Sequence, residues 1–283
     1  MAENPKKLVR SLTKRGPHRV LRGDLALAGQ PGVVFTPESG FGLPAVAFGH
    51  GWLTGSAGYR KTLEHLASWG IVAAAPDTAR GPVPSHRGFA VDLAATLDIC
   101  VGVRLGPGNI SVHPDKLAFA GHGMGASAAV LAAANRDVAA VAALYPAPTS
   151  PRAESVAGRV SAPLLVVGDG QDATSVDSDA RSLYEAAGDT ALLRIVPDAH
   201  RDGLGEGRYL YKALGATGSD RGTQHVTRAL LTGFLLSALT GDGTYDAFTD
   251  PDAEIPGTLT HPADDPQTSP ATALRQTSQL LRT

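Results

Sequence analysis

Short apolar runs alternate along this chain with stretches of helical spacing, and this alternation limits the folds that the chain can adopt. Residues 71–75 and 164–167 are continuous apolar runs, as is typical of strands buried on both faces. Residues 89–105 and 226–239 instead carry apolar residues at helical spacing. The sequence therefore predicts an α/β protein with a mostly parallel central sheet and helices on both of its faces.

The same pattern predicts where functional side chains gather. In open α/β sheets, ligands bind in loops beyond the carboxyl ends of the strands. Polar loops follow four of the expected strands, at residues 49–52, 121–125, 168–172 and 197–200. We therefore expect the chemical site of this protein at the sheet edge that these loops form.

The loop at residues 121–125 reads Gly-His-Gly-Met-Gly and joins an expected strand, 117–120, to an alanine-rich expected helix, 126–134. A strand, a glycine-spaced pentapeptide and a helix form the setting of a nucleophile elbow, Gly-x-Ser-x-Gly, whose sharp turn exposes a serine. Here Gly123 stands at the position of the serine. The pattern predicts the frame of such a turn without its nucleophile.

With these loops the chain resembles α/β hydrolases of the dienelactone hydrolase and polyester hydrolase (cutinase-like) group. The resemblance covers about residues 30–240, and its motifs are residues 48–52, 66–78, 115–125, 172 and 199–200. It implies an α/β-hydrolase fold. It also implies the chain order of that fold for the triad, Ser, then Asp, then His. We expect no large lid domain, because only 17 residues lie between Tyr145 and Pro163.

The resemblance gives individual residues their expected roles. His200 matches the catalytic base and Asp172 the acid that orients it, with Asp169 as the alternative acid. The backbone N–H groups of Trp52 and Met124 match the oxyanion hole, which stabilises negative charge on a substrate carbonyl oxygen.

Glycine at the nucleophile position has two consequences. Gly123 adopts the strained backbone of the elbow at little steric cost, but no covalent acyl-enzyme can form, because glycine has no side-chain atom to acylate. We therefore expect a pseudo-hydrolase that binds a small apolar ester or acyl ligand, or a protein partner. The alternative is an active carboxylic-ester hydrolase in which Asp172 and His200 activate water, or an engineered inactive variant of such an enzyme.

Three further residues are expected to contact the ligand beside the oxyanion turn: Leu53, His122 and Pro146. His50 and His122 are also expected to shape their turns. Ser127 lies one turn into the helix after the elbow, so we do not expect it to replace the missing nucleophile. The sequence shows no metal-ligand pattern, and residues 121–125 lack the Lys-Ser/Thr pair of a phosphate-binding loop. We expect no metal and no cofactor.

The composition fits one large domain: 283 residues, 43% of them hydrophobic, with a formal net charge of −2. This charge gives no reason to expect nucleic acid binding. The single cysteine, Cys100, excludes an internal disulfide. The sequence shows neither a secretory leader nor an apolar stretch of about 20 residues that could cross a membrane. We therefore expect a cytoplasmic protein.

The domain is expected at residues 19–250, between a basic arm, 1–18, and a polar, proline-rich tail, 251–283. Residues 1–22 carry seven Lys or Arg side chains and one acid, with apolar residues between them that fit a short amphipathic helix. We expect this arm either to be solvated or to attach to an anionic membrane surface or a protein partner. The long segment 201–222 is expected to fold over the mouth of the site.

Overall fold

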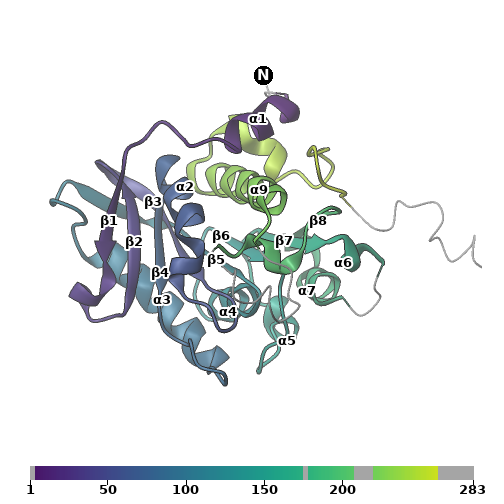
Figure 1. Cartoon of the computed structure of the whole chain (residues 1–283), viewed down its shortest axis with the longest axis horizontal. Helices are drawn as coiled ribbons and strands as arrows, with labels where there is room; N and C mark the ends of the chain where they lie inside the picture. The colour runs from purple at the N-terminus through teal and green to yellow at the C-terminus, as the bar shows by residue number, and fades with distance from the viewer. Residues whose placement is uncertain (1–3, 175–177, 207–218, 261–283) are drawn as a thin grey trace, which may run out of the picture.

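The computed structural model describes residues 4–174, 178–206 and 219–260. Within these ranges, eight strands form one sheet in the order β1-β2-β4-β3-β5-β6-β7-β8 (Figure 1). β1 pairs with β2 and β2 with β4 in antiparallel fashion, and the other pairs are parallel. The strands are β1 (Val20–Asp24), β2 (Gly32–Pro37), β3 (Gly40–Gly49), β4 (Val72–Pro76), β5 (Ile110–His122), β6 (Ala140–Leu144), β7 (Leu164–Asp169) and β8 (Ala191–Val196).

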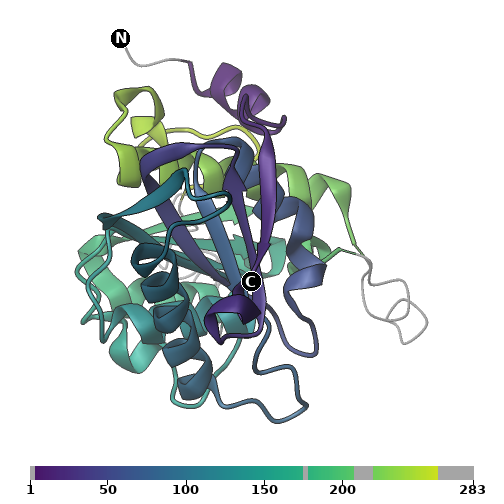
Figure 2. The same ribbon diagram turned by 90° about the vertical axis from the view of Figure 1, so that its left-hand side faces the viewer.

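Helices cover both faces of the sheet. One layer contains α3 (His86–Gly102), α4 (Met124–Ala133), α5 (Glu154–Ala157) and α7 (Asp179–Ala187). The other contains α1 (Pro5–Leu12), α2 (Arg60–Ser68) and α9 (Arg221–Thr240). Figure 2 shows the molecule from the side of β1, with α1 and α9 above the sheet and α3 below it. The short elements are α6 (Gly170–Thr174), η1 (Leu25–Ala28), η2 (Ser56–Tyr59), η3 (Gly188–Thr190), η4 (Arg201–Leu204) and η5 (Gly243–Phe248). The predicted mostly parallel sheet with helices on both faces is confirmed, as an α/β-hydrolase fold.

The two faces of the central strands belong to two separate apolar clusters. In β3, Ala45 and Ala47 pack with the α3 and α4 layer, whereas Val46 and Phe48 pack with the α2 and α9 layer. This division follows from the geometry of a strand, in which successive side chains point to opposite faces. Both faces are covered, so the strands read as continuous apolar runs, and this explains why the sequence revealed them.

Some elements differ from the prediction. β5 begins at Ile110, seven residues before the predicted strand, because polar residues such as His113 and Lys116 interrupt its apolar pattern. The helix α7 was not predicted, although Ser178 caps it by accepting a hydrogen bond from the N–H of Arg181. The helix that follows the elbow is confirmed.

The first part of the predicted basic arm is a docked helix. Leu8 and Leu12 of α1 are buried in the cluster formed with α9, and Figure 1 shows α1 resting against that helix. The side chains of Lys6, Lys7 and Arg10 are exposed. The apolar face of the amphipathic helix thus packs on the protein itself, and its cationic face is turned to solvent.

The beginning of the predicted tail also packs on the body. Leu259 exchanges two backbone hydrogen bonds with Ile195 of β8, and Ile255 is buried. The buried side chain of Arg194 donates hydrogen bonds to the carbonyl oxygens of Asp250, at 2.6 Å, and Pro251, at 3.3 Å. Residues 261–283 of the predicted tail lie outside the described residues. Across the described ranges, no helix is both long and apolar enough to cross a membrane.

Candidate functional site

The glycine pentapeptide forms the predicted sharp turn. β5 ends at His122, α4 begins at Met124, and Gly123 between them has φ 58° and ψ −122°. L-residues rarely adopt such a backbone, which glycine tolerates. A Cβ atom built on Gly123 would have Gly51 Cα, 3.8 Å away, as its nearest neighbour. The site therefore has room for a side chain here, and the lack of one is not imposed by packing.

The two outer glycines of the pentapeptide are needed for a different reason. A Cβ atom on Gly121 would overlap the backbone of Gly125, and a Cβ atom on Gly125 would overlap the backbone of Gly49 at the end of β3. The first turn of α4 therefore lies directly on the ends of β3 and β5, where only glycine fits. These contacts give the outer positions of the Gly-x-Ser-x-Gly pattern their physical basis in this chain.

The two expected oxyanion donors follow paired positions of neighbouring strands. Gly49 of β3 pairs with Gly121 of β5, and Trp52 and Met124 each stand three residues after their member of the pair. The N–H of Met124, at the first position of α4, donates no hydrogen bond to any described residue. The indole of Trp52 is half exposed and donates to the carbonyl oxygen of Pro82 at 3.0 Å. The oxyanion role of these two N–H groups stays a prediction.

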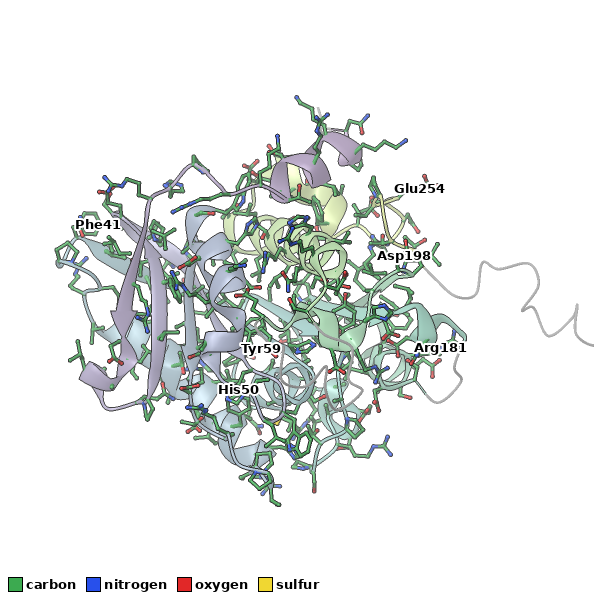
Figure 3. All side chains as sticks on the ribbon, in the orientation of Figure 1. Phe41, His50, Tyr59, Arg181, Asp198 and Glu254 are labelled. Atoms are coloured by element: carbon green, nitrogen blue, oxygen red, sulfur yellow. The ribbon has the colours of Figure 1, made fainter. Side chains whose placement is uncertain are left out.

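The loop after β3 is held firmly by side chains. The ring of His50 is fully buried, and its two nitrogens lie 2.9 Å from the carbonyl oxygen of Gly51 and 2.6 Å from that of Thr78. The N–H of Gly51 donates to the hydroxyl of Tyr59 at 3.0 Å. Figure 3 labels His50 and Tyr59 near the centre of the molecule. As predicted, His50 shapes this turn.

Both candidate acids are buried and strongly hydrogen bonded. Asp172 accepts from the backbone N–H of Asp169 at 2.7 Å and from the hydroxyl of Ser178 at 2.6 Å. Asp169 accepts from the N–H groups of Gln171, Asp172 and Arg201 at 3.0–3.3 Å. The two carboxylates thus form one connected network at the end of β7.

The positive charge next to these carboxylates belongs to Arg201. Its Nε lies 3.5 Å from an oxygen of Asp169, and its Nη2 lies 3.4 Å from an oxygen of Asp172. Buried carboxylates need such a partner, because an isolated charge loses its hydration on burial. The guanidinium of Arg201 therefore supplies positive charge beside both carboxylates.

The side chain of His200 lies elsewhere. It is exposed, and among the described residues its imidazole makes no hydrogen bond with Asp172. The N–H of His200 donates to Thr223 at 3.2 Å. Hydrogen bonds from Thr223 lower the pKa of Asp220, and the nearby charge of His200 lowers it further. The expected hydrogen bond between Asp172 and His200 is not formed in the described residues, and Ser178 and Arg201 contact the carboxylate instead.

A buried hydrogen-bonded chain connects three loops of the site. The Nδ1 of His122 lies 2.7 Å from the hydroxyl of Tyr59, and its Nε2 lies 2.6 Å from the carbonyl oxygen of Arg201. A carbonyl only accepts, so Nε2 carries the proton and Nδ1 accepts from Tyr59. His122 is 4% exposed. His122 therefore connects the elbow to the loop of Arg201 by hydrogen bonds. The prediction that it lines the mouth of the site is wrong, because its side chain is buried.

The remaining expected residues have mixed environments. Leu53 is partly exposed, with φ 51°, and Pro146 is buried. Ser127 is buried and donates to the carbonyl oxygen of Ala147 at 2.6 Å, which agrees with its exclusion as a nucleophile. Next to Pro146, Tyr145 has φ 48°, and burial raises the pKa of its phenol, which bonds to Thr227. Non-glycine residues with positive φ thus lie at the carboxyl edge of the sheet, where strained backbone often accompanies function.

Sequence reasoning missed Arg201, Ser178 and Tyr59 as members of the site. Two of them could have been found from weak signals in the sequence. Arg201 directly follows the predicted base, and Ser178 stands at the N-cap position before a helix. Residues 207–218 of the segment expected to cover the mouth lie outside the described residues. Just before them, Glu206 forms a 2.8 Å ion pair with Arg228 of α9, and burial raises the pKa of Glu206.

Comparison with known proteins agrees with this geometry. The model of the Dienelactone hydrolase family matches residues 102–197, which include the elbow, Asp169 and Asp172. No curated protein matches the chain. The chain thus has the α/β-hydrolase fold, and its residues 102–197 form a match to the Dienelactone hydrolase family.

Proposed function

We propose that this protein is a pseudo-hydrolase of the dienelactone hydrolase type, which binds a small apolar ester or acyl ligand or a protein partner. The observation that carries the proposal is the elbow, with the backbone and close packing of an active turn around a residue that lacks a nucleophile. The space above Gly123 is open, so the missing group is a local difference within an intact frame.

The acid network supports the same conclusion. In a working triad the acid orients the histidine and stabilises its positive charge. Here Arg201 is beside both Asp169 and Asp172, while His200 is exposed near Asp220. These contacts support a site in which Gly123 supplies no nucleophile and no hydrogen bond joins the acids to the predicted base within the described residues.

The mouth keeps groups that suit a ligand. The exposed indole of Trp52 offers an apolar surface, and the N–H of Met124 is available to a carbonyl oxygen in the described structure. The expected contact with an anionic membrane surface or an acidic partner is a separate proposal. It is supported by the exposed cationic side of α1, with Lys6 and Arg10.

Hydrolysis of p-nitrophenyl butyrate tests the proposal. We expect the chain, and its His200→Ala variant, to release nitrophenol no faster than an unrelated protein does. Gly123→Ser should gain slight activity that Gly123→Ala, the matched variant without a hydroxyl, does not gain. Adding Arg201→Gln to Gly123→Ser should raise this activity, because it frees Asp172 for His200. A folded but inactive double variant would contradict the idea that only these two residues separate the site from an active one.

The alternative function makes the opposite prediction. If Asp172 and His200 activate water directly, the unaltered chain hydrolyses the ester and His200→Ala abolishes the reaction. Removal of one triad member leaves about 10³–10⁴-fold catalysis over water in serine proteases, which is measurable. Such a result would overturn the pseudo-hydrolase.

Ligand binding is measured on the unaltered chain. Methyl octanoate should change the fluorescence of Trp52 in a saturable way, and the Trp52→Phe variant, which keeps Trp69, should lose the change. An unchanged emission would argue against an ester or acyl ligand at this mouth, and leave the protein-partner form of the proposal.

A further inference from the structure

A hollow lies away from the elbow, on the layer of α3, α4 and α5. It is lined by one face of α3, by the end of α4 and by α5 with the residues next to it, and its volume is about 510 Å³. These three helices lie along the lower side of the view in Figure 1. Hollows of about 300–1,000 Å³ are the usual size of small-molecule sites.

The charge of the lining is one-sided. The chain as a whole has a formal net charge of −2, yet the lining contains Arg87, Arg136 and Arg159 and no acidic residue. Arg136 is paired, because it donates to the carbonyl oxygen of Ala94 and lies 2.7 Å from Asp98. The side chains of Arg87 and Arg159 are exposed and form no ion pair or hydrogen bond with the described parts of the chain. Two guanidinium groups are therefore available to an anion.

The floor of the hollow is apolar. Small side chains, Ala90 and Ala94 on α3 and Ala132 on α4, leave space between the helices, and Leu131 lies beside them. The side chain of Val91 is 62% exposed. An apolar surface of this kind favours an alkyl chain, since covering it removes it from water.

The spacing along α3 joins these two features. Ala90 and Val91 come three and four residues after Arg87, and Ala94 comes four and three residues after them, so all four lie on one side of the helix. From Arg87 to Ala94 the helix rises by about 10 Å. Arg87 and part of the apolar floor thus share one side of α3 within the groove, which matches a molecule with an alkyl chain and a charged head.

We propose that this groove binds a medium-chain fatty carboxylate, with its chain on the alanine floor and its head at Arg87 and Arg159. Guanidinium groups match carboxylate geometry and form charge-assisted hydrogen bonds with it. The site is separate from the elbow, and it stands or falls independently of the proposed pseudo-hydrolase.

Isothermal titration calorimetry with dodecanoate, below its critical micelle concentration, measures the affinity of the site. Arg87→Gln and Arg159→Gln should each weaken binding about five- to tenfold, since a charge-assisted hydrogen bond is lost. Arg22→Gln makes the same charge change on β1, where the side chain is exposed, and should leave the affinity unchanged. Dodecanol, which lacks the charge, should bind weakly and equally to all of these variants.

A second pair of variants tests the apolar floor. Val91→Glu places an anion in the groove and should weaken dodecanoate binding more than tenfold. Val83→Glu changes another exposed valine, 92% exposed and outside the groove, and should have no effect. Three results would each overturn the proposal. The first is equal affinity for dodecanoate in Val91→Glu and Val83→Glu, and the second is equal affinity for dodecanol and dodecanoate. The third is loss of dodecanoate binding in Trp52→Ala and not in Val91→Glu.

Discussion

The three glycines of the elbow should respond very differently to substitution, and the structure gives the size of each effect. Gly123→Ser adds a side chain at φ 58°, and the nearest non-adjacent neighbour of its Cβ atom is Gly51 Cα at 3.8 Å. Its cost is therefore backbone strain alone, about 1–3 kcal/mol in the free energy of unfolding. Gly125→Ala instead drives a methyl group into the backbone of Gly49 and His50. Ordinary overpacking costs about 1–3 kcal/mol, and backbone atoms cannot rotate away, so we expect a larger loss.

The chain offers a close control for the strain. Gly188 has φ 65° and ψ −140°, near the values of Gly123, and nothing lies within 4 Å of its added Cβ atom. Gly188→Ser should therefore cost the same as Gly123→Ser, within about 0.5 kcal/mol, which is the usual scatter of independent sites.

Urea unfolding followed by circular dichroism measures all three variants. The expected order is a similar, moderate loss for the two serine variants and a much larger loss, or no folded protein, for Gly125→Ala. If Gly123→Ser costs far more than Gly188→Ser, the elbow has no room for a nucleophile, and the reasoning about an intact frame is refuted. A mild effect of Gly125→Ala would refute the close packing of α4 on β3.

Two further predictions concern stability. Burial, followed by the charge of Arg228, lowers the pKa of His65 to about 4 from the ordinary 6.5. The neutral imidazole therefore stabilises the folded state fully above pH 6.5. This contribution to the free energy of unfolding is lost as the pH falls to about 4, by about 3 kcal/mol at most. Urea titrations across this range should show a smaller loss of stability in His65→Gln than in the chain itself or in the control His113→Gln, whose imidazole is only partly buried. Equal slopes of stability against pH would contradict the prediction. Leu12→Ala should cost about 2–5 kcal/mol through the cavity that it leaves between α1 and α9, whereas Arg10→Ala should cost little; equal unfolding midpoints would mean that α1 does not contribute to the core.

The fold was predictable because its strands are buried on both faces. The segments that form β4 and β7 are continuously apolar, and the spacing of the glycines in the elbow predicts the turn after β5. The docking of α1 was not predictable. Its two buried apolar residues, Leu8 and Leu12, stand in a segment rich in basic residues, and the surface that covers them belongs to the distant helix α9. Sequence order alone shows which segments are apolar, but not which distant surface will cover them.

The site was predictable in its positions and not in its contacts. Gly123, Asp169, Asp172 and His200 all lie at or shortly after the carboxyl ends of strands, as expected, although Asp169 ends β7 and Asp172 lies in the short helix α6. Which cation pairs with the acids depends on the direction of two neighbouring side chains, and Arg201, not His200, turns toward them. Hydrophobic periodicity in the sequence cannot show which of two adjacent residues, His200 or Arg201, directs its side chain toward the acids.

The packing of residues 250–259 against β8 has a consequence for association between molecules. An edge strand with unpaired N–H and C=O groups is a template for pairing with another chain. The backbone groups of Ile195 are occupied by Leu259, and Arg194 fastens the segment through the carbonyl oxygens of Asp250 and Pro251. A polar, proline-containing stretch, which by composition looks like a tail, thus occupies the backbone of this edge strand at Ile195 and closes that position to pairing with another chain.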